Sequence, residues 1–243
     1  MIHLLLNFFL GAPSVGSPVP VRRDLYVRRF LAVARLVARR RFSRIDVAGS
    51  GRARGCDGPL VLYANHPGFW DPVVCGLMSQ ALFPKHHIYA PIDREALKTH
   101  WYFNGLGFFG IQKNSVAGLR DLRKIGSAIL TSVQRPILIV TPEGEISSPD
   151  QRPTRLKKGL SYLIGSLDCP RVTIFPLALR YQNAESRDAV AWAQLGQPLF
   201  VEPPTPRKQL QLKLETSLEK AMLDNDIRRT RDERGISLLE ETL

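Results

Sequence analysis

A histidine and an aspartate lie five residues apart in the segment NHPGFWDP, residues 65–72. The segment follows the apolar run PLVLYA at 59–64, which predicts a buried strand. A Pro-Gly turn after this strand can bring Asp71 beside the imidazole of His66. Histidine accepts a proton near neutral pH, and a carboxylate on its second ring nitrogen fixes the tautomer and stabilises the imidazolium. The spacing therefore predicts a general base, His66, with Asp71 as its orienter.

The same two residues also fit a structural interpretation. Asp71 followed by Pro72 is a frequent helix start, because aspartate caps free N–H groups and proline tolerates the first helical position. A single histidine at the end of a strand is often only a hydrogen-bonded loop residue. The choice between the two interpretations depends on the rest of the chain.

Four segments resemble, in order and spacing, the sequence blocks of the glycerolipid acyltransferase superfamily, which includes the PlsC-like lysophosphatidic acid acyltransferases. Asn65-His66 with Asp71 resembles the NHxxxxD block. The later segments are GIQK at 110–113, TPEGEIS at 141–147 with the glycine segment KKG at 157–159, and IFPL at 174–177. The resemblance covers about residues 45–200.

The resemblance implies transfer of an acyl group from acyl-CoA or acyl carrier protein to a hydroxyl of a lipid acceptor, such as a lysophospholipid. His66 would deprotonate the acceptor and Asp71 would orient His66. No metal or bound cofactor is implied, because the donor thioester is already activated. The expected substrate-binding residues are Lys113, Glu143, Gly144, Lys157 and Lys158.

Some of these expected substrate-binding residues can be interpreted without the resemblance. The basic loop RLKK at 155–158 offers charge-assisted hydrogen bonds to the phosphates of CoA, a carrier arm or a lipid headgroup. Glu143 and Gly144 also fit a type I turn with Pro142 at its second position. A structural role therefore stays open for Glu143.

Two departures from the family pattern concern the acceptor. The second block normally ends in arginine where this chain has Lys113, and the third normally has Thr-Arg where this chain has Glu145-Ile146. Arginine binds phosphate through two parallel hydrogen bonds, which lysine replaces only as a point charge and isoleucine not at all. We therefore expect an acceptor without the terminal phosphate of lysophosphatidic acid. A glycolipid, a carotenoid glycoside or an amino-acid lipid is the alternative acceptor.

The composition is that of a folded and strongly basic protein. The 243 residues are 44% hydrophobic, which is enough for a sizeable core, and their formal net charge is +12. This charge favours polyanionic partners such as an anionic membrane surface or nucleic acid. The three cysteines show no CxxC or Cys/His ligand spacing, which argues against a disulfide framework and a metal site. P-loop, HExxH and nucleophile-elbow motifs are absent, so NTPase, metalloprotease and serine-hydrolase functions lack support.

The positive charge is concentrated in residues 22–44, which contain nine arginines and one acidic residue. On a helix one face of this segment would be apolar and the other would carry arginines. The apolar face would consist of Tyr26, Phe30, Val33, Ala34 and Val37. This pattern predicts a basic amphipathic helix in an anionic lipid interface, on the cytoplasmic face of a membrane, with the protein peripheral or monotopic.

Two alternatives remain for this segment. It fits equally a solvated helix that docks on the core of the domain. A non-catalytic basic protein that binds a membrane or nucleic acid is the alternative from another functional class. The chain shows neither an RNP pattern nor zinc-finger spacing, so nucleic acid is not expected as a partner.

The chain divides into three predicted parts. Residues 1–21 hold a nine-residue apolar run at 2–10 and a linker; the run is short of the about 20 residues that cross a membrane. Residues 22–44 are the basic helix. Residues 45–243 alternate apolar runs with helical stretches, which predicts an α/β acyltransferase domain with a mixed, mostly parallel sheet flanked by helices. The expected helices are 71–82, 116–133 and 207–229, and the expected strands are 59–64, 137–140 and a third from 172.

Overall fold

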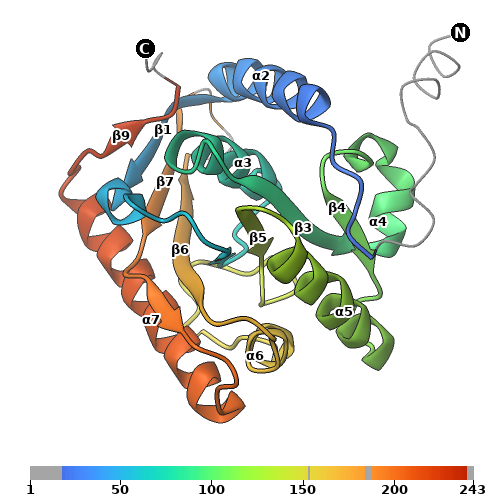
Figure 1. The fold of residues 1–243 in the computed structure, drawn as a ribbon. Coiled ribbons are helices and arrows are strands. Elements are labelled where there is room, and N and C mark those ends of the chain that lie inside the picture. The colour runs from blue at the N-terminus through green and yellow to red at the C-terminus, as the bar shows by residue number, and fades with distance from the viewer. Residues whose placement is uncertain (1–17, 153, 184–185, 187, 240–243) are drawn as a thin grey trace, which may run out of the picture.

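The computed structural model describes residues 18–239 of the chain apart from 153, 184–185 and 187. The predicted apolar run at 2–10 lies outside these residues. The described residues form one sheet with helices on both faces (Figure 1). Within them, no helix combines the length and the apolar character needed to cross a bilayer.

The sheet is mixed and mostly parallel, as the sequence predicts. Its strands are β1 (Phe42–Ala48), β2 (Leu60–Ala64), β3 (His87–Asp93), β4 (Phe108–Ile111), β5 (Pro136–Val140), β6 (Val172–Gln182), β7 (Ala189–Leu195), β8 (Leu199–Val201) and β9 (Ile236–Ser237). Their order is β4-β3-β5-β2-β6-β7-β1-β9, with β8 paired to β6. The neighbouring strands from β4 to β6 in this order are parallel, and so are β1 and β7. Three pairs are antiparallel: β6 with β7, β6 with β8, and β1 with β9.

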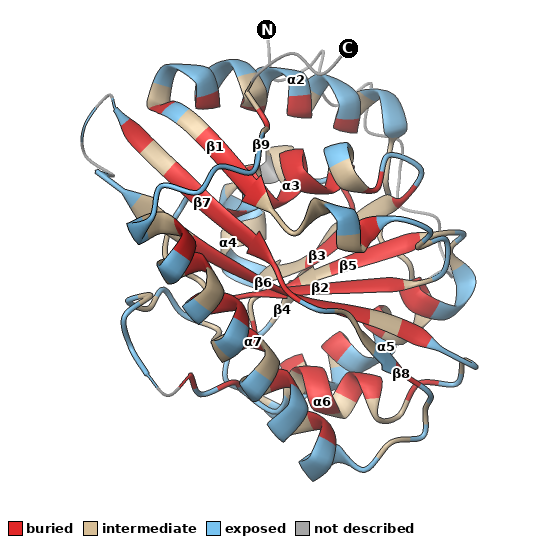
Figure 2. Ribbon diagram, turned by 90° about the vertical axis from the view of Figure 1, so that its left-hand side faces the viewer, coloured by how far each residue is buried: buried red, intermediate tan, exposed pale blue. Residues whose placement is uncertain are grey.

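Helices cover both faces of this sheet, as Figure 2 shows. One face carries α2 (Asp24–Arg41) and α3 (Asp71–Leu82), and the other carries α5 (Val116–Ser132), α6 (Gly159–Ile164) and α7 (Arg207–Thr230). The short helix α4 (Arg94–Thr99) contacts β3 and β4 at the edge of the sheet. Leu60 and Leu62 of the central strand β2 pack toward α2 and α3, and Val61 and Tyr63 pack toward α5, α6 and α7. Burial on both faces explains why this strand is a continuous apolar run.

Several predicted elements have the expected bounds. α3 spans 71–82, and α7 ends one residue beyond the expected 229. Ser115 caps α5, because its hydroxyl oxygen accepts a hydrogen bond from the N–H of Gly118 at 2.9 Å. α7 is not the last element, because the short strand β9, which the sequence analysis did not predict, follows it and pairs with β1.

The basic helix differs from its prediction in where it ends. It was expected over 22–44, but α2 ends at Arg41 and the chain continues as β1 without a loop. The helix ends here because of a contact with a distant segment. From Phe42 onward the chain pairs in parallel with β7, and Phe42, Ile45 and Val47 are buried in the core. α2 and β1 therefore belong to the same folded unit as the rest of the sheet.

The buried face of α2 also differs from the prediction. The helix packs against α3 through a row of buried side chains: Val27, Leu31, Ala34 and Ala38. Val33 and Val37 were expected on the apolar face, yet they are 60% and 44% exposed. Small residues decide this orientation, because the alanines and Gly76 of α3 let the two helices approach closely. The outer face of α2 consequently mixes exposed Leu25 and Leu36 with arginines.

Candidate active site

His66 and Asp71 meet in the loop between β2 and α3. The Nδ1 atom of His66 lies 2.5 Å from Oδ2 of Asp71, and the same oxygen accepts a hydrogen bond from the N–H of Gly68 at 3.3 Å. Asp71 is buried, whereas the His66 side chain is 24% exposed and lines a cavity. Nδ1 thus faces the carboxylate, and among the described residues Nε2 has no hydrogen-bond partner. A neutral imidazole held in this way can accept a proton at Nε2.

The capping interpretation of Asp71 does not describe this geometry. Asp71 is the first residue of α3 rather than the residue before it, which is Trp70. Its carboxylate bonds to the imidazole and to the turn, and no side-chain cap bond to the start of α3 is formed. The structure therefore places Asp71 where an orienter of His66 has to lie.

A tyrosine that the sequence analysis did not single out completes this pair. The hydroxyl of Tyr181, on β6, donates a hydrogen bond to Oδ1 of Asp71 at 2.6 Å. Burial and the neighbouring Asp71 charge raise the pKa of Tyr181 well above its usual value, so the hydroxyl keeps its proton. The tyrosine ring packs against Phe42 of β1, with the ring centroids 5.9 Å apart. No local spacing links Tyr181 to Asp71, because only the pairing of the strands brings them together.

Glu143 holds the backbone of the His66 loop. Its Oε2 atom accepts hydrogen bonds from the backbone N–H of His66 at 2.9 Å and from the hydroxyl of Ser147 at 2.6 Å. The N–H of Ser147 donates in turn to the carbonyl of His66 at 3.0 Å. The expected turn is present as well, since the N–H of Gly144 donates to the carbonyl of Thr141 at 3.0 Å. The loop after β5 and the loop after β2 are therefore held together through the backbone of His66.

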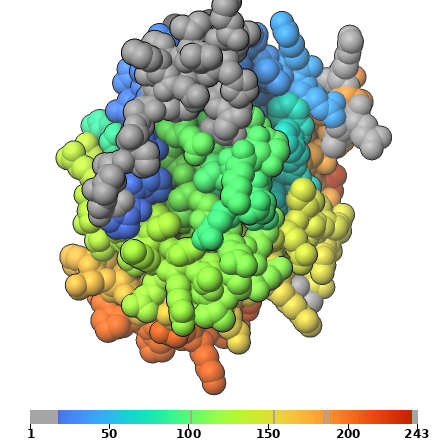
Figure 3. Space-filling model, turned by 90° about the vertical axis from the view of Figure 1, so that its right-hand side faces the viewer, coloured from blue at the N-terminus to red at the C-terminus, as the bar shows by residue number. Residues whose placement is uncertain are grey.

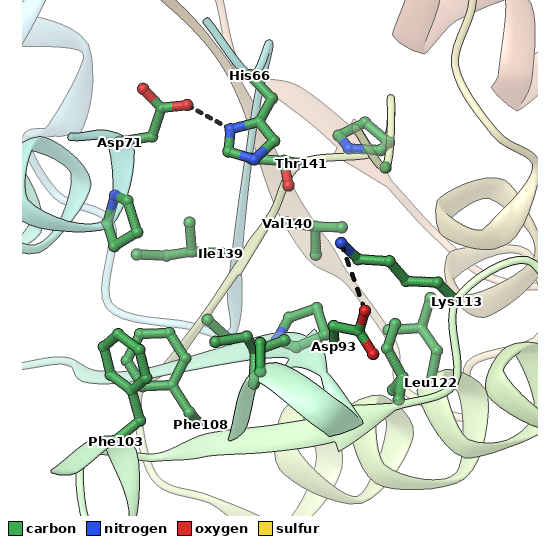
Figure 4. Close-up of a pocket in the computed structure, with 18 of the residues that line it drawn as sticks. His66, Asp71, Asp93, Phe103, Phe108, Lys113, Leu122, Ile139, Val140 and Thr141 are labelled. Atoms are coloured by element: carbon green, nitrogen blue, oxygen red, sulfur yellow. Dashed lines mark hydrogen bonds and ion pairs between the residues drawn. The ribbon is translucent and has the colours of Figure 1, made fainter. Parts of the chain in front are cut away.

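The cavity beside His66 has a volume of about 820 Å³ and lies where the parallel strands β2 to β5 end (Figure 4). Carboxyl ends of parallel strands are the usual place for a ligand in such sheets. One part of the cavity is lined mainly by apolar side chains, which come from α2, from the segment before β4 and from β4. These are Val27, Phe30, Leu31, Phe103, Leu106 and Phe108. Volume and lining suit a hydrocarbon chain.

The other part of the cavity carries lysines. Nζ of Lys113 lies 3.7 Å from Oδ2 of Asp93, and Nζ of Lys157 donates to Oδ1 of Asn114 at 2.9 Å. Lys158 lines the cavity as well, and the described residues offer its ammonium no hydrogen-bond or ion-pair partner. Figure 3 shows the face on which the segment from β3 to β4 (green) and α5 (light green) lie beside the loop that follows β5 (yellow). The lysines therefore come from segments that meet at this face.

The predicted substrate-binding residues are only partly brought together. Lys113, Gly144, Lys157 and Lys158 all line the cavity. Glu143 does not line it. Gly144 has a φ of +75°, a left-handed backbone conformation that favours glycine.

Of the two residues that replace the Thr-Arg of the family pattern, Glu145 and Ile146, only one lines the cavity. Ile146 lines the cavity and is 62% exposed, but Glu145 is not part of the lining. Ile146 thus adds apolar surface near the lysines and no positive charge. Among the described residues, no group of three His, Cys, Asp or Glu side chains could hold a metal ion.

Comparisons with known proteins bear on the fold. No protein-family model matches the chain, and no curated protein sequence matches it. The crystal structure of the 1-acyl-sn-glycerophosphate (LPA) acyltransferase PlsC from Thermotoga maritima is similar, with a TM-score of 0.56. The likeness covers 93% of this chain and 88% of PlsC at 16% sequence identity. This chain has the fold of PlsC.

The PlsC likeness extends over nearly the whole chain. The predicted mixed, mostly parallel α/β fold is therefore confirmed. A second solved structure, the pilus retraction motor PilT with bound ADP, has a TM-score of 0.35 at 8% sequence identity. This likeness covers 79% of this chain and 63% of the PilT chain. A similarity this low carries no argument about fold or function.

Proposed function

We propose that the protein is a lipid acyltransferase that moves an acyl group from a thioester donor, acyl-CoA or acyl carrier protein, to a hydroxyl of a lipid acceptor. The observation that carries this proposal is the position of the His66 and Asp71 pair on the wall of a cavity that has both an apolar part and a part with lysines. An acyl chain fits the apolar part, and phosphates of the donor or acceptor fit the lysines. The PlsC-like fold supports the same activity.

The chemistry requires one proton acceptor and no bound cofactor. The acceptor hydroxyl gives its proton to Nε2 of His66 while its oxygen attacks the carbonyl carbon of the thioester. Asp71 stabilises the imidazolium that forms, and Tyr181 fixes the carboxylate in place. When the tetrahedral intermediate collapses, the carbon–sulfur bond breaks and the imidazolium proton passes to the leaving thiolate.

We further propose that the reaction takes place at the cytoplasmic surface of a membrane. The outer face of α2 exposes Leu25 and Leu36 among its arginines. Apolar and cationic side chains on one exposed helix face favour an anionic lipid interface. The inner face of the same helix lines the cavity through Val27, Phe30 and Leu31, which puts lipid and cavity on opposite sides of α2.

The test is a transfer assay with purified protein, acyl-CoA and a panel of lysophospholipids, glycolipids and other hydroxylated lipids. Thiol release with one of these acceptors is expected from the parent protein. His66→Ala should lower the rate by about 10²- to 10⁴-fold with a nearly unchanged melting temperature, which is the usual cost of losing a general base. His87→Ala is the matched control, since His87 lies outside the cavity lining. Full turnover by His66→Ala would show that the mechanism is wrong.

A further inference from the structure

A second recess lies on the outer surface between α5 and α6. Its volume is about 510 Å³, and it is lined by three cationic side chains of α5, namely Arg120, Arg123 and Lys124. Tyr162 of α6 and Asp168 belong to the same lining. None of these residues takes part in the proposed acyl transfer.

The charges of this recess are not balanced by the protein. Arg120, Arg123 and Lys124 lie three and four residues apart, so they neighbour each other on one helix face, where like charges repel. Within the described part of the chain no salt bridge involves any of the three, and Asp168 is the single acidic residue in the lining. An anionic ligand would offset this repulsion.

Tyr162 contacts two arginine side chains. Its hydroxyl accepts a hydrogen bond from Nη1 of Arg123 at 2.9 Å, and this bond lowers the pKa of Tyr162. The guanidinium of Arg207, at the start of α7, lies over the tyrosine ring at 4.4 Å from its centroid. Arg123 and Arg207 therefore both contact Tyr162, and of the two only Arg123 lines the recess. The guanidinium of Arg123, which Tyr162 holds in place, can bind phosphate oxygens through parallel hydrogen bonds.

The recess is next to the part of the main cavity that carries the lysines. On α5, Leu119 and Leu122 line the main cavity, whereas Arg120 and Arg123 beside them line the recess. On α6, the N–H of Tyr162 donates to the carbonyl of Lys158 at 2.9 Å, so the two residues are one helical turn apart. A ligand can therefore contact the recess while a flexible arm of the same molecule enters the cavity.

We infer that this recess binds the phosphorylated nucleotide end of coenzyme A, and that the donor of the reaction is therefore acyl-CoA. The inference rests on the proposed acyl transfer for its biological meaning. Its physical basis is a concave, cationic site placed beside the cavity that would receive the pantetheine arm. A recess of this size suits a small molecule, whereas a carrier protein docks over a broad surface of about 800 Å² on each partner.

The experiment measures binding of CoA to the full chain by calorimetry, with dephospho-CoA as a second probe. Arg120→Gln/Lys124→Gln removes two cations that have no salt bridge in the described structure and leaves the bond between Arg123 and Tyr162 in place. Its Kd for CoA should rise at least tenfold, because a charge-assisted hydrogen bond to phosphate corresponds to roughly a tenfold change or more. Lys85→Gln/Lys213→Gln is the control with the same charge change at exposed positions outside both cavities, and its Kd should match the parent.

Each outcome decides the assignment. The parent should bind CoA more tightly than dephospho-CoA, and the recess variant should lose most of this difference. Unchanged CoA affinity in the recess variant overturns the inference. Loss of transfer from acyl carrier protein with unchanged CoA binding overturns it too, and assigns the recess to an acidic carrier. Transfer from acyl-pantetheine, which has no nucleotide, tests the proposed function separately and should be equal in parent and variant.

Discussion

Tyr181 donates a hydrogen bond to Asp71 at 2.6 Å across a separation of 110 residues in the chain. Oδ1 of Asp71 takes this bond, while Oδ2 faces Nδ1 of His66 and the N–H of Gly68. Both oxygens of a buried carboxylate are thereby engaged, which fixes its orientation and offsets its lost hydration. The candidate catalytic pair is thus a group of three side chains, with Tyr181 as a positioning residue.

The first prediction concerns this third member. Tyr181→Phe keeps the ring against Phe42 but removes the donor, and a hydrogen bond to a charged group contributes about 1.5–3 kcal/mol. We expect kcat to fall about tenfold or more while KM for the donor stays close to the parent value. Steady-state kinetics with a fixed acceptor measures both quantities.

A double variant separates positioning from general damage to the fold. If Tyr181 acts through Asp71 and His66, Tyr181→Phe should add no further loss in a His66→Ala background, because residues that act as a unit are not additive. An equal loss in both backgrounds would show that Tyr181 acts independently of His66.

The second prediction distinguishes two roles for Glu143. The sequence analysis expected substrate binding, whereas the structure bonds Glu143 to the backbone N–H of His66 and to Ser147. Glu143→Ala should lower kcat at constant KM, and it should lower the free energy of unfolding by about 1–3 kcal/mol because the His66 N–H loses its partner. Glu145→Ala, the same change at an exposed neighbour, is the control. A raised KM with unchanged kcat would restore the substrate-binding role.

The third prediction concerns the acceptor. Ile146 lines the cavity without charge, and Lys113 faces Asp93 at 3.7 Å, so neither position that holds an arginine in the family pattern offers a phosphate monoester an unpaired guanidinium. The parent should therefore prefer neutral or zwitterionic hydroxylated lipids to lysophosphatidic acid. Ile146→Arg should shift the ratio of kcat/KM toward lysophosphatidic acid by about 1.5–3 kcal/mol, and Ile146→Gln should not. A parent that already prefers lysophosphatidic acid would contradict this account.

The fourth prediction tests the outer face of α2. Arg28, Arg29 and Arg40 are exposed, and replacing all three by glutamine should weaken binding to anionic vesicles by about 1 kcal/mol per charge. High salt should have the same effect on the parent. Sedimentation with vesicles of mixed anionic and zwitterionic lipid measures the binding. Equal sedimentation of parent and variant would mean that α2 is only an element of the fold.

Local signals explain what the sequence predicted correctly. The Ser115 cap, the apolar run at 59–64 and the Asp71 helix start depend on neighbours within a few residues, and the structure has them as expected. The pairing of His66 with Asp71 was predictable for the same reason, since a turn of five residues joins them.

Contacts between distant segments explain what the sequence could not supply. Tyr181 reaches Asp71 only because β6 lies beside β2, and Glu143 reaches His66 only because β5 lies on the other side of β2. The face that α2 buries was misjudged because close packing on Gly76 of α3 decides it, and helical periodicity alone does not contain this neighbour. The predicted end of α2 was wrong because Phe42 pairs with β7, a strand that follows about 150 residues later in the chain.

The direct passage of α2 into β1 has a consequence for how the molecule would sit on a bilayer. Because no loop separates Arg41 from Phe42, the helix cannot pivot independently of the sheet that holds His66. The outer face of α2 and the cavity wall formed by Val27 and Leu31 are two sides of one helix, about 10 Å thick. With α2 lying in the headgroup layer, the height of His66 above the hydrocarbon would be constant. If the protein has the proposed acyltransferase activity, it would then select acceptors by the distance between their hydroxyl and the acyl chains.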